Sequence, residues 1–292
     1  MPGAPHRLGY PLPLEPTIAA LFALLWGSLW GSFLNVVVYR VPAGLSVVRP
    51  RSRCPQCLTP IAGWHNVPVL SWLLLRGKCA ACKAPISVRY PAVESTVAAL
   101  SLAVAMPWLP LCLADDAVAW PPLVAALTEQ AFVFTWVAIA LIDADTFLVP
   151  DALSLPLPLV GLALAALCGD LRGVSWQQAA AGALLGGGGL FVVQWAYARV
   201  TGREGLGTGD IKLLAGIGAL LGVVALPAVL LAAALQGLMF AGGYAVVQRD
   251  KALHDRGLQS LRHLALPFGP FLVLAAIQWL LLHRLVAPWL GL

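Results

Sequence analysis

The sequence predicts an all-α membrane protein with about eight transmembrane helices and a small zinc-binding domain between the first two spans. Only 11% of its 292 residues are charged, whereas a soluble domain carries about 25%. Hydrophobic residues make up 60% of the chain, and the mean hydropathy is +0.85. Several apolar runs approach the ~20 residues that a helix needs to cross a bilayer. Together these observations exclude an ordinary soluble protein.

The expected spans follow one another with short polar connections. They cover approximately residues 17–39, 90–113, 121–142, 152–168, 178–200, 211–224, 227–247 and 266–286. In the first span, Gly27, Ser28, Gly31 and Ser32 form a face of small residues that suits close helix packing. Four glycines at 186–189 predict close packing or a kink in the fifth span. We expect three parts: residues 1–39, a loop domain at 40–90, and a seven-span domain at 91–292.

The distribution of cations predicts how the chain lies in the membrane. Residues 40–90 contain eight Lys and Arg residues and no acidic residue, so the positive-inside rule places this loop in the cytoplasm. With eight spans, all cations except Arg7, Arg172 and Arg284 fall on that side. The lipid bilayer is therefore the expected partner. We expect no nucleic acid, because the basic loops lack interleaved aromatic residues.

Two C-x-x-C pairs in this loop predict a metal site. The pairs are Cys54 with Cys57 and Cys79 with Cys82, and twenty-one residues separate them. Two such knuckles supply the four thiolates of a structural zinc site, and their spacing is close to that of zinc ribbons. A redox dithiol and idle thiols are the alternatives. A disulfide is disfavoured, because thiols stay reduced in the cytoplasm.

Aspartates at the inner ends of two helices are the candidate catalytic groups. Asp143 follows one apolar run and Asp210 precedes another, beside Gly207 and Gly209. Two neighbouring carboxyls share a proton, so one can accept a proton from water while the other donates to a scissile carbonyl. The two glycines would let a substrate backbone approach closely.

Other interpretations of these carboxyls remain open. Asp210 and Asp151 each precede a helix and are candidate N-caps. Paired membrane aspartates also serve proton-coupled transporters, and a zinc-organised scaffold without catalysis is a third possibility. Glu94 is expected either to cap its helix or to face a cavity. Asn35 is a candidate for an interhelical hydrogen bond.

Taken in order along nearly the whole chain, the motifs resemble one family. They are Gly31-Ser32-Phe33-Leu34-Asn35-Val36 with Tyr39-Arg40, the two cysteine pairs, Pro68-Val69-Leu70-Ser71-Trp72, Arg89-Tyr90-Pro91 with Glu94, Ile142-Asp143, Pro150-Asp151, Gly207-x-Gly209-Asp210 with Lys212, and Pro267-Phe268-Gly269-Pro270. This series is similar to the type IV prepilin leader peptidases, which are membrane aspartyl proteases of the GxGD kind and are also called prepilin peptidase/N-methyltransferases.

The resemblance implies an enzyme of the bacterial inner membrane with its catalytic face in the cytoplasm. It would remove the basic leader peptide from type IV prepilins or type II secretion pseudopilins. The catalytic pair would be Asp143 and Asp210, with Asp145 and Asp151 as rivals for the first role. Lys212 would lower the pKa of Asp210 or bind an acidic residue of the substrate. The resemblance leaves the oligomeric state open.

The resemblance also implies a second activity, in which the new N-terminal residue is methylated with S-adenosylmethionine. The loop at 40–90 would contribute to it, and Asn35 and Arg40 are the candidate residues. No Gly-rich strand-to-helix loop of a soluble methyltransferase is found in the sequence, so this activity depends on the resemblance alone.

Overall fold

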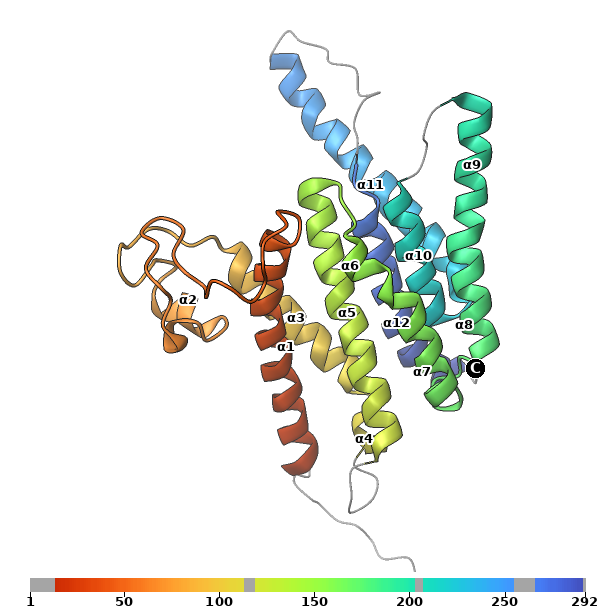
Figure 1. Cartoon of the computed structure of the whole chain (residues 1–292), viewed down its shortest axis with the longest axis horizontal. Helices are drawn as coiled ribbons and strands as arrows, with labels where there is room; N and C mark the ends of the chain where they lie inside the picture. The colour runs from red at the N-terminus through yellow and green to blue at the C-terminus, as the bar shows by residue number, and fades with distance from the viewer. Residues whose placement is uncertain (1–13, 113–118, 203–206, 255–265, 291–292) are drawn as a thin grey trace, which may run out of the picture. The chain divides into compact units, whose positions relative to one another are not determined.

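The computed structural model describes residues 14–112, 119–202, 207–254 and 266–290. Helices dominate the described residues (Figure 1), and the only β-type pairings among them are two isolated bridges. The predicted all-α class is therefore confirmed. Four cations used in the topology argument lie outside the described residues, namely Arg7, Arg203, Arg256 and Arg262.

Five described segments are long and apolar enough to cross a membrane, which makes this a multi-pass membrane protein. They lie in α1 (Leu14–Arg40), α5 (Trp120–Thr146), α6 with α7 (Asp151–Ser154 and Pro156–Arg172), α8 through α9 (Trp176–Ala183, η2 Leu184–Gly189, Leu190–Thr201) and α11 (Ala225–His254). Each corresponds to a span predicted from the sequence.

The expectation of eight spans is not confirmed, because the described parts of three helices are too short to count as apolar spans. Helix α3 (Arg89–Ala105) ends before Pro107, and Pro110 falls within the four-residue α4 (Leu109–Cys112). Helix α10 (Thr208–Leu221) has 14 residues and is therefore about 21 Å long, less than the ~30 Å of a bilayer core. The apolar part of α12 (Gly269–Leu290) that is described covers Gly269–His283.

The chain divides into two compact units. The first holds residues 1–36 and 48–130, and the second holds 37–47 and 131–292. The first unit therefore contains α3, α4 and the start of α5 as well as the cysteine loop.

Close contacts between α1 and α3 organise the first unit. A Cβ added to Gly27 would lie 2.5 Å from the Cβ of Ser101, and one added to Gly31 would lie 2.7 Å from the Cα of Glu94. The Ser101 hydroxyl donates to the carbonyl of Ala23 at 2.8 Å. The face of small residues predicted in the first span therefore packs as expected. The 3-10 helix η1 (Gly63–His65) and the short α2 (Leu70–Leu74) complete this unit.

Helix α10 lies at the centre of the second unit, against α7, α8, η2 and α12. Its last eleven residues are almost all buried. A Cβ on Gly182 of α8 would lie 2.1 Å from the Gly218 carbonyl oxygen, so only glycine allows these backbones to meet. The predicted glycine run forms the π-helix η2, where Gly186 lies against the Leu214 carbonyl. This packing fixes α10 and the residues of its first turn.

Candidate functional site

In the second unit, Asp143 and Asp210 lie close enough for the charge of Asp143 to act on Asp210. Asp143 lies in the last turn of α5, which ends where Phe147 takes a positive φ of 55°. Asp210 lies in the first turn of α10, outside the five apolar segments. Burial, and then the nearby charge of Asp143, raises the pKa of Asp210 to about 6. This electrostatic effect joins two carboxyls that lie far apart in the sequence.

The carboxylate of Asp143 is held by the N-terminus of α12. Asp143 is only 5% exposed, and its Oδ2 accepts a hydrogen bond of 3.0 Å from the Gly269 N–H. This N–H is one of those that a helix start leaves unpaired, and the helix dipole there favours a negative charge. A Cβ on Gly269 would lie 2.6 Å from that same Oδ2. Glycine at 269 therefore leaves room for the carboxylate.

The two glycines before Asp210 have different surroundings. A Cβ on Gly209 would lie 2.7 Å from the Cβ of Val149, so this glycine is required by packing against the α5–α6 connection. Among the described residues, a Cβ on Gly207 would meet only the Asp210 carboxylate, at 3.4 Å. Packing against the described residues therefore explains the glycine at 209, and substrate approach stays a prediction for Gly207.

The predicted capping roles are wrong for both candidates. Gly207 occupies the N-cap position of α10 and Pro150 that of α6 (Asp151–Ser154), and neither helix start has a side-chain cap. Asp151 instead accepts a hydrogen bond of 2.5 Å from Lys212 Nζ. Lys212 stands two residues after Asp210, so the two side chains leave α10 in different directions.

Lys212, Asp145 and Asp151 are the other predicted residues near this site, and none of them is buried as Asp143 is. Lys212 forms an ion pair with Asp151, and the pKa of Asp210 is raised and not lowered. Asp145 is exposed, and the side chain of Asp151 is 61% exposed. Among the three carboxyls near the end of α5, Asp143 is the buried one whose charge acts on Asp210.

The four predicted metal ligands converge in the first unit. The sulfur atoms of Cys54, Cys57, Cys79 and Cys82 all lie within 4.8 Å of one another, and the Sγ atoms of Cys54 and Cys82 are 3.7 Å apart. Four thiolates at a Zn–S distance of about 2.3 Å in a tetrahedron lie ~3.8 Å from one another. The cluster therefore fits a metal ion with four sulfur ligands.

The two knuckles have the same backbone fold. The N–H of Cys54 bonds to the Thr59 carbonyl, and the N–H of Cys79 bonds to the Ala84 carbonyl. The residue after each second cysteine, Leu58 or Lys83, has a positive φ close to 60°. Hydrogen bonds with Thr59 lower the pKa of Cys57 to about 6, which favours the thiolate that a metal needs.

Glu94 connects α3 to the loop domain within the first unit. It is buried, and its Oε2 accepts a hydrogen bond of 2.6 Å from the N–H of Val69. Val69 has a φ of 60°, which is rare for a β-branched residue. Glu94 makes no cap bond at the start of α3, so the predicted cap is wrong and the carboxylate instead holds a strained turn.

The two candidate methyltransferase residues make backbone contacts. The Asn35 side-chain amide donates to the carbonyls of Gly31 and Tyr90, each at 3.3 Å, which is the predicted interhelical hydrogen bond. Arg40 donates to the Ser46 carbonyl at 2.9 Å.

Sequence reasoning assigned no role to Gly269, although it lies in a motif that carried the resemblance. Nothing local marks it as a partner of Asp143, because 126 positions separate the two residues. The sequence does place Gly269 directly before an apolar helix, where free N–H groups are expected. This position could have marked it as a partner for a carboxylate.

Comparison with known proteins places the chain in one family. The model of the bacterial peptidase A24 N-terminal domain matches residues 25–108, and that of the type IV leader peptidase family matches residues 131–242. Proteins named prepilin leader peptidase/N-methyltransferase from Aeromonas hydrophila and Pseudomonas putida are each 38% identical to it. The first alignment covers 94% of both chains, and the second covers 92% of this chain and 93% of the relative. No solved structure matches. The chain belongs to the type IV leader peptidase family.

Proposed function

We propose that this chain is a prepilin leader peptidase that cleaves with the carboxyl pair Asp143 and Asp210, and that it also methylates the new N-terminus. The observation that supports the catalytic pair is that the charge of Asp143, together with burial, raises the pKa of Asp210. The relatives named prepilin leader peptidase/N-methyltransferase align with this chain over nearly their full length.

In this proposal the pair works through one shared proton. The ionised carboxyl takes a proton from a water molecule as its oxygen attacks the scissile carbonyl carbon. The protonated carboxyl donates to the carbonyl oxygen, which gives a gem-diol. On collapse, the carboxyl that took the water proton passes it to the leaving nitrogen, the C–N bond breaks, and the other carboxyl regains a proton from the gem-diol hydroxyl. The pKa of Asp210, about 6, supports a shared proton. An ordinary aspartate has a pKa of about 3.9 and so loses its proton at a lower pH than Asp210 does.

The surrounding residues would keep this pair in place. The Gly269 N–H orients the Asp143 carboxylate, and the packing of Gly209 on Val149 sets the start of α10. The Asp151–Lys212 ion pair connects α6 to α10. Gly207 leaves space beside Asp210 for a peptide backbone.

We propose that the active face is the cytoplasmic face of the inner membrane. Support comes from the eight cations and absence of acids in residues 40–90, since cytoplasmic loops are rich in Lys and Arg. Prepilins or pseudopilins would be the substrates at that face.

We propose zinc for the four-cysteine cluster. Four thiolates leave no open coordination position, so the metal would stabilise the loop domain and take no part in peptide cleavage. Cys54, Cys57, Cys79 and Cys82 would hold it. Their convergence within 4.8 Å supports this assignment.

The methylation half of the proposal follows the names of the relatives. S-adenosylmethionine would supply the methyl group, with Asn35 and Arg40 as candidate residues. Transfer of a labelled methyl group to cleaved prepilin is the direct test, and cleaved product without label would remove this half alone.

Peptide hydrolysis by the purified full chain tests the peptidase assignment. The protein in lipid nanodiscs is incubated with a prepilin in water enriched in oxygen-18, and the products are weighed by mass spectrometry. We expect a shortened pilin and a leader whose new carboxyl carries one heavy oxygen. An intact prepilin under conditions in which the protein is folded would contradict the assignment.

A further inference from the structure

Helix α2 in the first unit exposes a row of leucines. Leu70, Leu73 and Leu74 are three of its five residues, and they are between 57% and 82% exposed. Their spacing of three and four positions puts them on one side of the helix, and they form what we call the α2 face. Trp64 in the neighbouring η1 is 75% exposed. Exposed apolar surface of this kind marks a site of contact with a protein or a membrane.

Hydrogen bonds hold the α2 face in a fixed orientation. The hydroxyl of the buried Ser71 donates to the Trp64 carbonyl at 3.0 Å and joins η1 to α2. Trp72 Nε1 donates to the Ile86 carbonyl at 3.0 Å, and the Trp72 ring lies where a Cβ on Gly77 would come within 2.8 Å of it. These two side chains attach α2 to the cysteine loop, so the leucines of the α2 face stay exposed.

The start of α2 lies at the depth of an apolar membrane span. Val69, the N-cap residue of α2, donates its N–H to Glu94 Oε2. The Cα of Glu94 packs on α1, where it would lie 2.7 Å from a Cβ on Gly31. Gly31 precedes Arg40, the last residue of α1, by nine positions, which is about 13 Å along the helix. Because α1 holds one of the five apolar spans, a face at this depth meets lipid.

Two cations follow α2 directly. Arg76 and Lys78 are exposed, and the chain stays beside α2 here because their N–H groups bond to the carbonyls of Leu73 and Leu75. Residues 40–90 contain no acidic residue that could neutralise them. Long basic side chains cover apolar surface with their stems and keep the charge at the level of the lipid headgroups. Anionic headgroups attract cations in this position.

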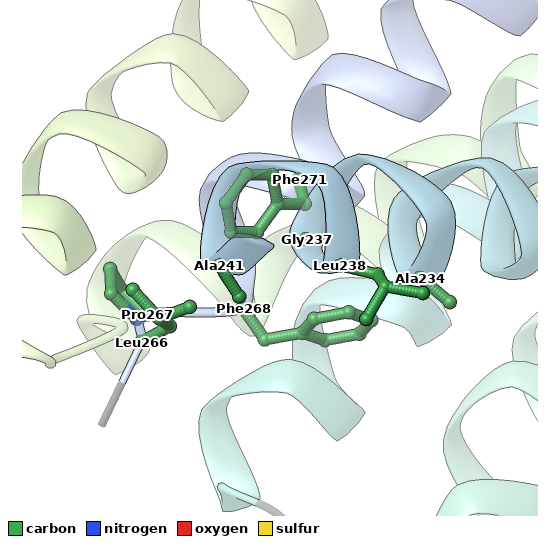
Figure 2. A pocket seen from close by; sticks show the side chains of 8 residues that line it. All are labelled: Ala234, Gly237, Leu238, Ala241, Leu266, Pro267, Phe268 and Phe271. Carbon is green, nitrogen blue, oxygen red and sulfur yellow. The ribbon is translucent and has the colours of Figure 1, made fainter. Parts of the chain in front are cut away.

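Charge distinguishes the α2 face from the apolar pocket of the second unit. That pocket lies between α11 and the start of α12 (Figure 2), and its lining residues carry no charge that would indicate what fills it. The α2 face instead combines leucines with cations at the depth of a membrane span. We propose that the α2 face docks into the membrane surface, where Arg76 and Lys78 bind the phosphate groups of anionic phospholipids. This docking does not depend on the proposed peptidase activity.

The test measures which lipids approach Trp64 in the full chain. The protein is made with 5-fluorotryptophan and placed in phosphatidylcholine nanodiscs, and the fluorine resonance of Trp64 is identified by its absence in Trp64→Phe. Each sample contains the same small fraction of phosphatidylglycerol or phosphatidylcholine with a spin label on the same acyl carbon, which broadens nearby resonances. We expect the labelled phosphatidylglycerol to broaden Trp64 roughly 10- to 30-fold more, since each cation near an anionic surface contributes about 5-fold.

Variants connect this preference to the two cations. Arg76→Gln with Lys78→Gln should bring the ratio of broadening by the two lipids close to 1. Arg76→Lys with Lys78→Arg is the matched control, because it keeps both charges and should keep the ratio. Raising the salt concentration should lower the ratio in the wild type. The resonance of Trp136, which is buried in the second unit, should show no preference and reports whether each variant is folded.

A third variant tests the leucines. Leu73→Ser with Leu74→Ser should reduce the broadening of Trp64 by both lipids and should open Trp64 to a gadolinium chelate in the water. Both side chains are exposed, so their replacement removes no internal packing.

Three results in the wild type would each overturn the proposal. Equal broadening of Trp64 by the two labelled lipids would mean that the cations take no part in docking. Broadening by the gadolinium chelate without broadening by lipid would mean that the α2 face lies in water. Shielding of Trp64 from both agents would mean that a protein surface, such as a second copy of the chain, covers this face.

Discussion

Replacing Gly269 with alanine tests whether the position of the Asp143 carboxylate controls cleavage. The added Cβ would lie 2.6 Å from Oδ2 of Asp143 and 3.2 Å from its carboxyl carbon. The backbone of Gly269 has no positive φ, so alanine adds no conformational strain. The clash falls on the far end of one side chain, and the carboxylate must turn away from the Gly269 N–H.

The two consequences of this shift differ in size. Loss of one hydrogen bond to a buried carboxylate destabilises the fold by about 1–3 kcal/mol. A displacement of about 1 Å in a reacting group costs roughly 100-fold in rate. We therefore expect Gly269→Ala to remain folded and to lower kcat about 100-fold, with little change in KM.

The assay is prepilin cleavage under saturating substrate, beside thermal unfolding in the same detergent. Gly242→Ala serves as the control, since a Cβ there would meet no described atom within 4 Å and the change in helix propensity is the same. A Gly269→Ala protein that cleaves at the wild-type rate would refute the proposed role of this contact.

Three further predictions concern the aspartate site and the cysteine cluster. The raised pKa of Asp210 means that the folded state binds this proton more tightly than the unfolded state, so stability falls as pH rises from about 4 to 6. Asp210→Asn should flatten this trend, with a gain of about 1–2 kcal/mol near neutral pH after allowance for its partial exposure, and an unchanged slope would contradict it. The Asp151–Lys212 pair is partly exposed, so Asp151→Asn should cost at most about 1 kcal/mol in unfolding measurements, and a larger loss would point to a further role. Cys54→Ser should release the bound metal, detected by elemental analysis, and make residues 40–90 sensitive to protease while α5 and α11 remain protected; full metal content would refute the four-thiolate site.

Local patterns in the sequence predicted much of the fold. The small-residue face of α1 appears as tight contacts at Gly27 and Gly31, because helix packing depends on side chains that repeat along one helix. The cysteine knuckles were predictable for a similar reason, since each closes through hydrogen bonds within a few residues. The number of full spans was not. Pro107 follows the end of α3 well before the predicted limit at residue 113, whereas α10 keeps the 14 residues that were predicted for its span.

The partners of the carboxyl groups were not predictable from local patterns. Asp143 binds the N–H of Gly269, Glu94 binds that of Val69, and Asp151 pairs with Lys212. Each of these contacts joins segments that tertiary folding brings together. Local rules favoured capping at Asp151 and Glu94, but neither side chain makes a cap bond.

Cleavage by single aspartate variants is the most direct test of the aspartate pair. Asp143→Asn, Asp210→Asn and Asp145→Asn are each purified in nanodiscs, shown to be folded, and assayed with one prepilin. Asn keeps the shape of the side chain but cannot accept the proton, so we expect the first two variants to lose cleavage by at least about 1,000-fold. Asp145→Asn should retain it. Wild-type cleavage by folded Asp143→Asn or Asp210→Asn would contradict the account.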